Sequence, residues 1–324
     1  MPLQIRYEGR EFGSTSLEVA VDETSATHHE LIEPAGIELA MATGSSASRL
    51  PIPGVDDSRV CTIRAASDAV RMLDGIESNE PVLVVGSGFV GCEAAGSLKA
   101  RGLDVTIAST ESLPQGDRLG PDAGRLIDGW LRELGVVMRP AVRVERLEHG
   151  SASTRAHLDD GTTGDSGWVM MATGASPNIE LAESVGLVSG GAVPVDAAMR
   201  TVAPDVFAVG DIARAFNTSA GRALRVEHWG DAERMGTIAG TVAAGAEDAW
   251  AQVPGFWSSI AGRQLKYVAW GDGWDQAVVK SSAHGLTIWY ARNGQYAGVL
   301  TYDHDDDIDA GTALIKSHAQ FDLR

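Results

Sequence analysis

A glycine-rich turn follows a run of apolar residues near the first third of the chain. Residues 82–85 read Val-Leu-Val-Val, and Gly86, Gly88 and Gly91 then form a Gly-x-Gly-x-x-Gly pattern. In such a turn the first glycine permits a tight bend, the second lets the backbone approach a pyrophosphate, and the third lets helix and strand pack closely. The helix that begins here can bind an anion through its amide groups and dipole. The pattern therefore predicts a site for a dinucleotide such as NAD(P)H.

The next strand lacks the acid that usually binds an adenosine ribose at this point. Residues 104–109 end in Ser109, followed by Thr110, where an acid would bind the 2′-hydroxyl. Glu111 lies slightly further along and could substitute. The Ser109 and Thr110 hydroxyls could also tolerate a 2′-phosphate, although no arginine stands nearby to pair with it. The choice between NADH and NADPH is open at this stage.

Apolar strands alternate with amphipathic helices around this turn. Strands are predicted over residues 82–85, 104–108 and 168–172, with shorter ones near 136–148 and 154–158, and helices over 88–102 and 121–135. Such alternation is typical of a parallel, doubly wound (Rossmann-like) sheet whose two faces are covered by helices. Residues 81–174 are therefore predicted to form an α/β nucleotide-binding domain.

The segments on either side of this domain do not form a domain alone. Residues 36–44 and 202–211 each place a short apolar strand before a small-residue turn, which indicates one domain interrupted by an inserted one. Alternating strands begin near residue 254, after a predicted helix over 231–245. Asn293-Gly294 within residues 286–302 predicts a hairpin, because a type I′ turn needs positive φ at both central residues.

Composition excludes several classes of function. The 324 residues include 26 basic and 44 acidic side chains, for a formal net charge of -18, which opposes binding to nucleic acid or to an anionic membrane. No apolar stretch approaches a membrane span, and a cytoplasmic location is expected. Cys61 and Cys92 are widely spaced, which argues against a disulfide framework, a zinc site or thiol redox chemistry.

No metal site is expected from the sequence. The acids within residues 303–309 precede a predicted helix over 308–316, where carboxylates stabilise the positive end of the helix dipole. His28 and His29 lie in a polar segment without a partner Cys or paired His, which favours a solvated turn. Most of the tryptophans toward the C-terminal end are expected in a core or interface; they are Trp250, Trp257, Trp270, Trp274 and Trp289.

Several short motifs occur in a characteristic order. They are A-T-G at 42–44, L-P-I-P-G at 50–54, G-S-G-F-V-G-C-E at 86–93, A-T-G at 172–174, A-V-G-D at 208–211 and R-V-E-H-W at 225–229. Over nearly its whole length the chain resembles the FAD-dependent ferredoxin reductases of oxygenase systems. The resemblance implies an FAD-type domain from residues 1–80 and 175–250, an NAD(P)H-binding-like domain at 81–174 inserted in it, and a C-terminal α+β interface domain at 251–324.

The resemblance also implies an enzymatic activity and roles for single residues. In such reductases NAD(P)H gives a hydride to FAD, which passes single electrons to a ferredoxin. Expected cofactor-binding residues are Gly86, Gly88 and Gly91 for the pyridine nucleotide, Glu93 for the nicotinamide amide, Asp211 for the flavin ribityl chain, and Thr43 of the first A-T-G. Expected catalytic residues that line the flavin ring are Glu227, His228 and Trp229. Each has an ordinary structural alternative, such as a helix cap for Asp211, a solvated position for Glu93 or a core position for Trp229.

The start of the chain departs from the family pattern. The family begins with a strand, a second Gly-x-Gly-x-x-Gly turn and an acid that hold the FAD pyrophosphate and ribose, and this chain resembles a truncated member that lacks them. FAD binding is therefore expected to be doubtful, with a degenerate site or one completed by a partner, such as a second subunit in a homodimer. Ferredoxin is also a doubtful partner, because ferredoxins are typically acidic and this chain is acidic too.

Two other functions remain open from the sequence. A flavin-free enzyme could use the vacated flavin cavity for a non-redox reaction on a small organic substrate, with Glu227 or His228 as acid or base. A non-catalytic scaffold derived from a reductase is the other possibility. The first expectation remains an NAD(P)H-dependent oxidoreductase.

Overall fold

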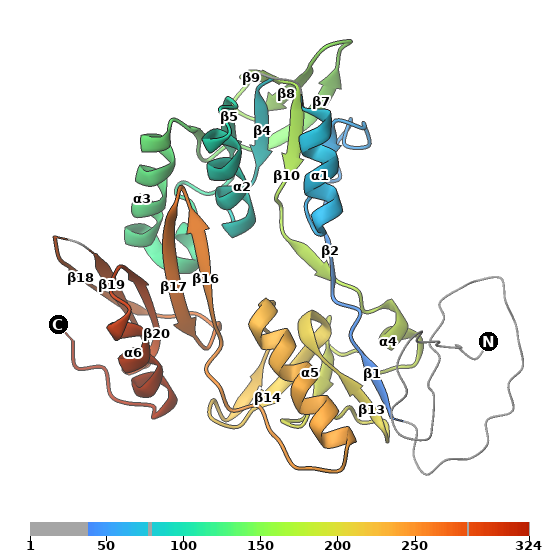
Figure 1. The fold of residues 1–324 in the computed structure, drawn as a ribbon, viewed down its shortest axis with the longest axis vertical. Helices are drawn as coiled ribbons and strands as arrows, with labels where there is room; N and C mark the ends of the chain where they lie inside the picture. Colours follow the sequence, from blue (N-terminus) through green and yellow to red (C-terminus); the bar gives the residue numbers. More distant parts are fainter. Residues whose placement is uncertain (1–37, 77–79, 284, 324) are drawn as a thin grey trace, which may run out of the picture. The chain divides into compact units, whose positions relative to one another are not determined.

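The computed structural model describes residues 38–76, 80–283 and 285–323 (Figure 1). The chain divides into two compact units, Met1–Leu39 and Ala40–Arg324. Every described helix lies in the second unit, and β1 (Leu39–Met41) begins at the boundary. The strands expected early in the chain and the pair at His28 and His29 lie outside the described residues.

A five-stranded parallel sheet carries the glycine turn. Its order is β3 (Val60–Cys61), β10 (Trp168–Met171), β4 (Val82–Val85), β5 (Val105–Ala108) and β6 (Val137–Arg139). Every residue of β4 and β10 is buried, as expected of central strands. The predicted parallel sheet is confirmed, but strand pairing extends it to β3, which lies outside the predicted 81–174 boundaries. The division into domains stays a prediction.

Helices cover one face of this sheet. They are α1 (Ala66–Gly75), α2 (Phe89–Ala100) and α3 (Gly116–Leu134). Val84, Ile107 and Met170 share a buried cluster with side chains from all three helices. Helix α3 is interrupted at Gly120, whose φ is 84°, and Pro121 resumes it at the residue where the sequence predicted the helix to start.

The opposite face is covered by an antiparallel sheet. Its strands are β7 (Val144–His149), β8 (Thr154–Leu158) and β9 (Thr163–Ser166). Leu83, Val85 and Met171 pack against residues of β7 and β8 in a separate buried cluster. The prediction that helices cover both faces is therefore wrong for this face. Residues of β8 alternate between buried and more exposed positions, as in a sheet with one face on a core.

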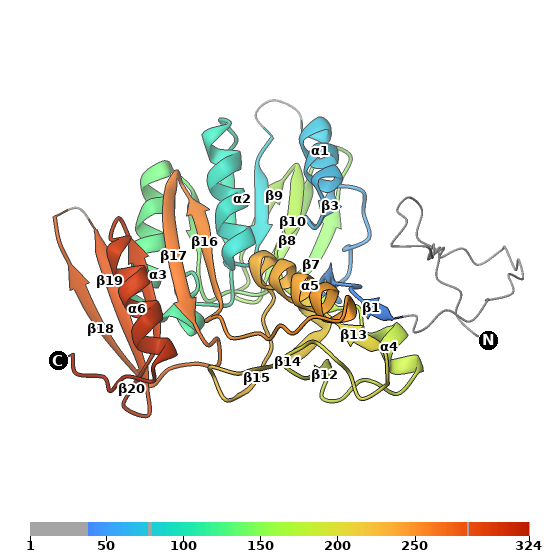
Figure 2. The same ribbon diagram turned by 60° about the horizontal axis from the view of Figure 1, so that its bottom comes forward.

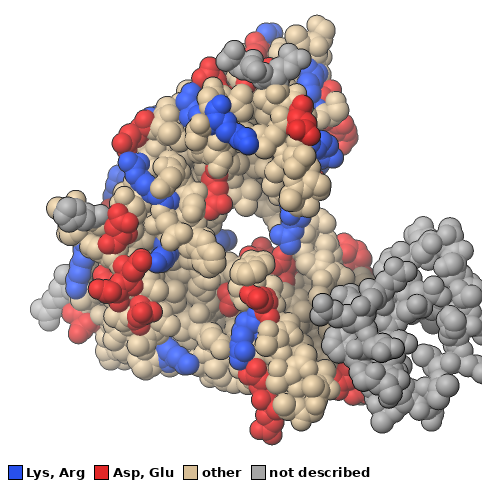
Figure 3. All heavy atoms as spheres, in the orientation of Figure 1, with Lys and Arg blue, Asp and Glu red and all other residues tan. Residues whose placement is uncertain are grey.

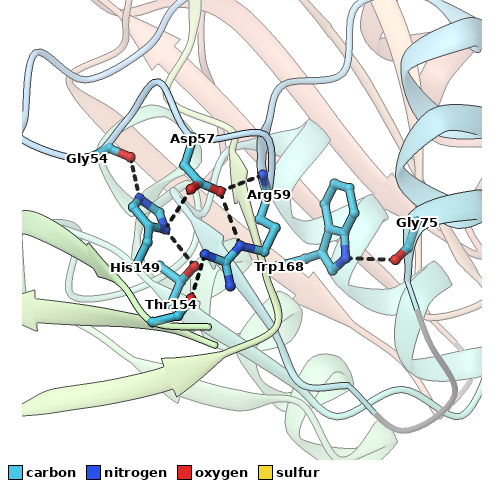
Figure 4. Close-up of polar contacts among 8 residues, drawn as sticks. Gly54, Asp57, Arg59, Gly75, His149, Thr154 and Trp168 are labelled. Carbon is cyan, nitrogen blue, oxygen red and sulfur yellow. Dashed lines mark hydrogen bonds and ion pairs between the residues drawn. The ribbon is translucent and has the colours of Figure 1, made fainter. Parts of the chain in front are cut away.

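A hydrogen-bond network fastens the chain before β3 onto this antiparallel sheet (Figure 4). His149 Nε2 lies 2.7 Å from the Gly54 carbonyl oxygen, and Nδ1 lies 2.9 Å from Thr154 Oγ1. Because a carbonyl only accepts, Nε2 must carry a proton. The Asp57 carboxylate accepts two hydrogen bonds from Arg59, one from the side-chain Nε–H at 3.1 Å and one from the backbone N–H, and these bonds close the loop. Hydrogen bonds to Asp57 lower the pKa of its carboxyl.

The remaining strands near α5 form three small sheets. Besides β1 these are β2 (Ser45–Ala47), β11 (Ala175–Pro177), β12 (Val193–Val195), β13 (Val206–Ala208), β14 (Ala213–Asn217) and β15 (Arg222–Leu224), with α4 (Glu180–Ser184), the 3₁₀ helix η1 (Gly210–Ile212) and α5 (Trp229–Ala243). The antiparallel pair β2 and β11 joins the segments that follow the two A-T-G motifs. The Met41 carbonyl accepts a hydrogen bond from the Val209 N–H. Segments from 41–47 and 175–243 are thereby brought together.

The C-terminal part is an antiparallel sheet with one helix. Its strands are β16 (Gly255–Ile260), β17 (Arg263–Ala269), β18 (Gln276–Ser281), β19 (Leu286–Arg292) and β20 (Gln295–Tyr302), in the order β16-β17-β20-β19-β18. The predicted hairpin is confirmed, with φ of 53° at Asn293 and 74° at Gly294. Helix α6 (Asp306–Lys316) lies against this sheet (Figure 2), with Gly311 packed on Val299 of β20.

Most of the tryptophans toward the C-terminal end lie in the interior. Trp250, Trp270 and Trp289 are buried, whereas Trp257 is 62% exposed. The indole N–H of Trp274 donates to the Arg118 carbonyl at 2.9 Å. In the described part of the chain, no helix combines the length and the apolar character needed to cross a membrane.

Substitution of Gly54 tests whether the loop before β3 depends on its close backbone contact with β7. A Cβ at Gly54 would lie 2.1 Å from the Leu147 carbonyl oxygen, and φ there is 87°. Gly161 has a φ of 81° but no atom within 4 Å of its Cβ position. We expect Gly161→Ala to lower the free energy of unfolding by about 1–2 kcal/mol, and Gly54→Ala by roughly 2–5 kcal/mol, because overpacking adds to the backbone cost.

Chemical unfolding of both variants measures this difference. Equal losses for the two variants would show that the contact with Leu147 relaxes without cost.

Candidate functional site

The glycine turn is built by backbone contacts that leave no room for side chains. A Cβ at Gly86, where φ is 105°, would lie 2.3 Å from the Ala172 carbonyl oxygen. A Cβ at Gly91 would lie 2.2 Å from the Gly86 carbonyl oxygen. Gly88 precedes α2 in extended conformation, and no side chain caps the helix there. The amide groups of the first turn of α2 are therefore available for an anion, as the sequence predicted.

The end of β5 lies directly beside this turn. Ser87 Oγ, inside the turn, is 2.7 Å from Ser109 Oγ, and both residues are buried. Ser109 Oγ also accepts a hydrogen bond from the Glu111 N–H at 3.2 Å. The pKa of the Glu111 carboxyl is raised above its usual value, mainly because the group is partly buried and secondly because the negative charge of Asp117 is nearby. Glu111 therefore lies close to the position where a ribose-binding acid is expected.

Glu93 connects the glycine turn's helix to the C-terminal sheet. Its Oε1 accepts hydrogen bonds from Ser258 Oγ at 2.6 Å and from the Ser259 N–H at 2.9 Å. The carboxylate is thus held in one orientation by β16 and is not simply solvated. Its expected role toward a nicotinamide amide stays a prediction.

A second group of residues surrounds Asp211. Its carboxylate accepts from the Arg64 guanidinium at 3.1 Å, and its side chain is only 12% exposed. The same guanidinium nitrogen lies 3.5 Å from the Cβ position of Gly44 in the first A-T-G motif. Arg64 therefore joins the A-T-G turn to the A-V-G-D turn.

The hydrogen bonds of Thr43 stabilise the conformation of the first A-T-G turn. Its hydroxyl donates to the Asn178 carbonyl at 2.6 Å, while the Asn178 side-chain amide donates to the Thr43 carbonyl at 2.9 Å. Ser46 Oγ donates to the same amide's oxygen at 2.8 Å. These bonds fix the turn next to Gly44, and the expected cofactor contact of Thr43 is not tested by them.

Of the three expected catalytic residues, two have polar partners and the third is exposed. Glu227 accepts from Arg225 at 2.9 Å, whereas His228 Nδ1 lies 3.2 Å from the buried carboxylate of Asp231. Trp229 begins α5 and is 74% exposed, so the core alternative for its side chain is wrong. Their catalytic roles stay predictions.

Phe256 links the glycine turn's helix to this motif. Its ring centroid lies 4.7 Å from that of Phe89 and 4.6 Å from that of His228. Residue 89 begins α2 and residue 228 precedes α5, so β16 supplies the contact between the two helix starts. Figure 3 shows an opening in the surface above the position that α5 has in Figure 1, with basic and acidic side chains at its border.

The structure also identifies residues that the sequence did not single out. Arg64, Asn178 and Ser258 each contact a predicted site residue, but they lie 147, 135 and 165 positions from their partners in the chain. Only the folding of the chain brings each of them next to its partner.

Thiol and metal chemistry find no support in the described residues. Burial raises the pKa of the Cys61 thiol to about 11 and that of Cys92 to about 12, which leaves little thiolate at neutral pH. No group of three His, Cys, Asp or Glu side chains in the described ranges could hold a metal ion. Asp306, Asp307 and Asp309 lie in the first turn of α6, where they stabilise its dipole.

Known proteins are similar to this chain in sequence and in fold. The NADH oxidase of Methanocaldococcus jannaschii is 35% identical over 214 residues, which cover 64% of this chain and 47% of that protein. The ferredoxin–NAD(+) reductase subunit of the benzene 1,2-dioxygenase system of Pseudomonas putida is 28% identical over 286 residues, covering 86% and 68%. The chain thus spans about half the length of the first relative.

A solved structure and a family profile agree with these relatives. An FAD-dependent pyridine nucleotide-disulphide oxidoreductase from Desulfovibrio vulgaris superposes with a TM-score of 0.76 at 25% identity, over 87% of this chain and 76% of that one. The resemblance to ferredoxin reductases is confirmed. The profile of one family matches residues 18–236. The chain belongs to the pyridine nucleotide-disulphide oxidoreductase family.

Proposed function

We propose that the protein oxidises NAD(P)H with the help of FAD and passes the electrons to a ferredoxin-type acceptor. The observation that carries this proposal is the glycine turn, where a side chain at Gly86 or Gly91 would overlap the backbone. A turn under this constraint, followed by an uncapped helix, suits close approach of a pyrophosphate. The relatives' names supply the electron acceptor and the flavin.

The comparisons do not support two doubts raised by the sequence. The doubt about FAD rested on the beginning of the chain, and residues 1–37 lie outside those described. The doubt about ferredoxin rested on net charge, yet the Pseudomonas putida relative is named as a ferredoxin–NAD(+) reductase. A flavin-free enzyme and a scaffold are not favoured, because the relatives are named as oxidoreductases. A cytoplasmic location stays a prediction.

Asp211, Arg64 and Gly44 fit the hydroxyl-rich part of a flavin. Asp211 can accept from ribityl hydroxyls while Arg64 fixes its carboxylate, and Gly44 leaves the turn open beside the guanidinium. When bound, FAD supplies the conversion of a hydride into single electrons. The chain's own part would be to orient the two cofactors, with α2 holding the nucleotide and β16 fixing the orientation of the Glu93 carboxylate.

Direct reduction tests the proposed activity. Protein incubated with FAD and freed of excess should retain the flavin, and NADH or NADPH added without oxygen should bleach its absorbance. Reoxidation by a purified [2Fe–2S] ferredoxin from an oxygenase system then identifies the acceptor. Protein that binds neither FAD nor nicotinamide nucleotide in calorimetry would refute the proposal.

Variants of the ion pair test the flavin role of its two residues. We expect Asp211→Asn and Arg64→Ala each to weaken FAD binding about tenfold, which corresponds to ~1.4 kcal/mol. Arg71→Ala is the matched control, because Arg71 pairs with Asp68 on the exposed side of α1. The measurement is a titration followed by flavin fluorescence. Unchanged FAD affinity in both variants would exclude this role for the pair.

A further inference from the structure

A chain of hydrogen bonds joins the connection between β18 and β19 to the start of α6. The Oγ of Ser282, which lies in this connection, is 2.9 Å from His304 Nε2. The other ring nitrogen of His304, Nδ1, lies 3.0 Å from Thr287 Oγ1 on β19. The Thr287 hydroxyl in turn donates to the carboxylate of Asp307, in the first turn of α6. A serine hydroxyl, an imidazole and a carboxylate are thus connected through one threonine.

The partners along this chain determine which atoms carry protons. Thr287 gives its only hydroxyl proton to Asp307, so toward His304 its oxygen can only accept. Nδ1 of His304 must therefore carry a proton, and in the neutral ring Nε2 is then an acceptor. The hydrogen bond between Nε2 and Ser282 Oγ is accordingly donated by the serine, whose oxygen also accepts from the Gly285 N–H at 3.1 Å. The serine hydroxyl therefore donates to a basic nitrogen.

The two ends of the chain of hydrogen bonds differ in exposure. Thr287 is completely buried, whereas Ser282 is exposed. The backbone of Gly285 lies against the imidazole, since a Cβ there would be 2.8 Å from His304 Cδ2 and 2.4 Å from the Tyr302 carbonyl oxygen. The ring is thereby held in one orientation, with its basic nitrogen directed at a hydroxyl that small molecules can reach from solvent.

We propose that Ser282 is a nucleophile activated by His304, and that it takes the acyl group from small esters with good leaving groups. Thr287 and Asp307 act as positioning residues, because they fix the tautomer and the orientation of the imidazole. A nucleophile, a base within hydrogen-bond reach and a third group that orients the base are the parts that such chemistry requires. This activity lies outside the proposed redox function and does not depend on the glycine turn.

The proposed reaction has two steps. Ser282 Oγ forms a bond to the acyl carbon while its proton passes to His304 Nε2. The bond between the acyl carbon and the leaving oxygen then breaks, and the leaving oxygen takes that proton. Water attacks the acyl-serine in the same way, which releases the acid and restores the serine hydroxyl. In both steps the Asp307 carboxylate stabilises the imidazolium through Thr287.

The surrounding charges select the substrate. Asp303, Asp305 and Asp306 are exposed and flank His304 in the chain, and only Asp305 is paired, with Lys266. The excess of negative charge favours the imidazolium and repels an anionic substrate. Neutral esters are therefore the class that this arrangement would accept.

Covalent labelling of the full-length protein tests the inference. We expect a fluorophosphonate probe to label the protein, with the label mapped to Ser282 by mass spectrometry, and p-nitrophenyl acetate to release a burst of p-nitrophenol. Ser282→Ala should abolish both reactions. Ser281→Ala is the matched control, because Ser281 is exposed at the end of β18 and outside the hydrogen-bond chain, so it should react like the wild type.

Variants of the base and of the threonine test the relay itself. His304→Gln should slow labelling at least about 100-fold, as expected for loss of a general base. We expect Thr287→Val to slow labelling roughly tenfold and Thr287→Ser to restore it, because serine keeps the hydroxyl that joins the imidazole to the carboxylate. Thermal unfolding of each variant shows whether it folds like the wild type.

An unlabelled wild-type protein, a label on another residue, or equal rates for Ser282→Ala and the wild type would overturn the inference. Equal rates for folded Thr287→Val and the wild type would overturn the positioning role of the threonine. The assay contains neither flavin nor nicotinamide nucleotide, so these results leave the proposed redox function untouched.

Discussion

The close approach of three backbone segments is the constraint on which the rest of the site depends. Gly86 lies against the Ala172 carbonyl, and Gly91 lies against the carbonyl of Gly86. Because β4 and β10 are neighbouring central strands, this approach draws the start of α2 onto the carboxyl end of the sheet. The bonds of Ser87 to Ser109 and of Glu93 to Ser258 follow from that placement. A side chain at either glycine would disturb all of them together.

The two faces of the parallel sheet have different tasks. The face with Leu83, Val85 and Met171 packs on β7 and β8, and the network around His149 fastens the loop before β3 to the same strands. The other face carries α2 and α3, which share a buried cluster with residues of β17, β19 and β20. One face therefore holds the loop before β3 in place, while the other brings the C-terminal sheet to α2, the helix that follows the glycine turn.

Local sequence patterns predicted where strands and turns lie better than they predicted which elements pack together. The strand before Gly86 was predicted residue by residue, and the hairpin at Asn293 followed from the backbone angles that its turn needs. A strand at 154–158 was predicted with the bounds of β8, and the one near 136–148 overlaps β7. Their antiparallel pairing with β9 over the second face was not predicted, because the alternation within a short strand does not identify its partner strands. Arg64 could not be assigned from the sequence, since its partner Asp211 lies 147 positions away and only the fold brings them together.

The anchoring of Glu93 has a consequence for communication through the molecule. The carboxylate joins the helix that begins at the glycine turn to a strand of the C-terminal sheet. A ligand that recruits this oxygen leaves the Ser258 hydroxyl and the Ser259 amide in search of other acceptors, and an unpaired group of this kind costs free energy. Such a ligand would therefore weaken the link between α2 and β16, whose Phe256 ring lies against His228 at the start of α5.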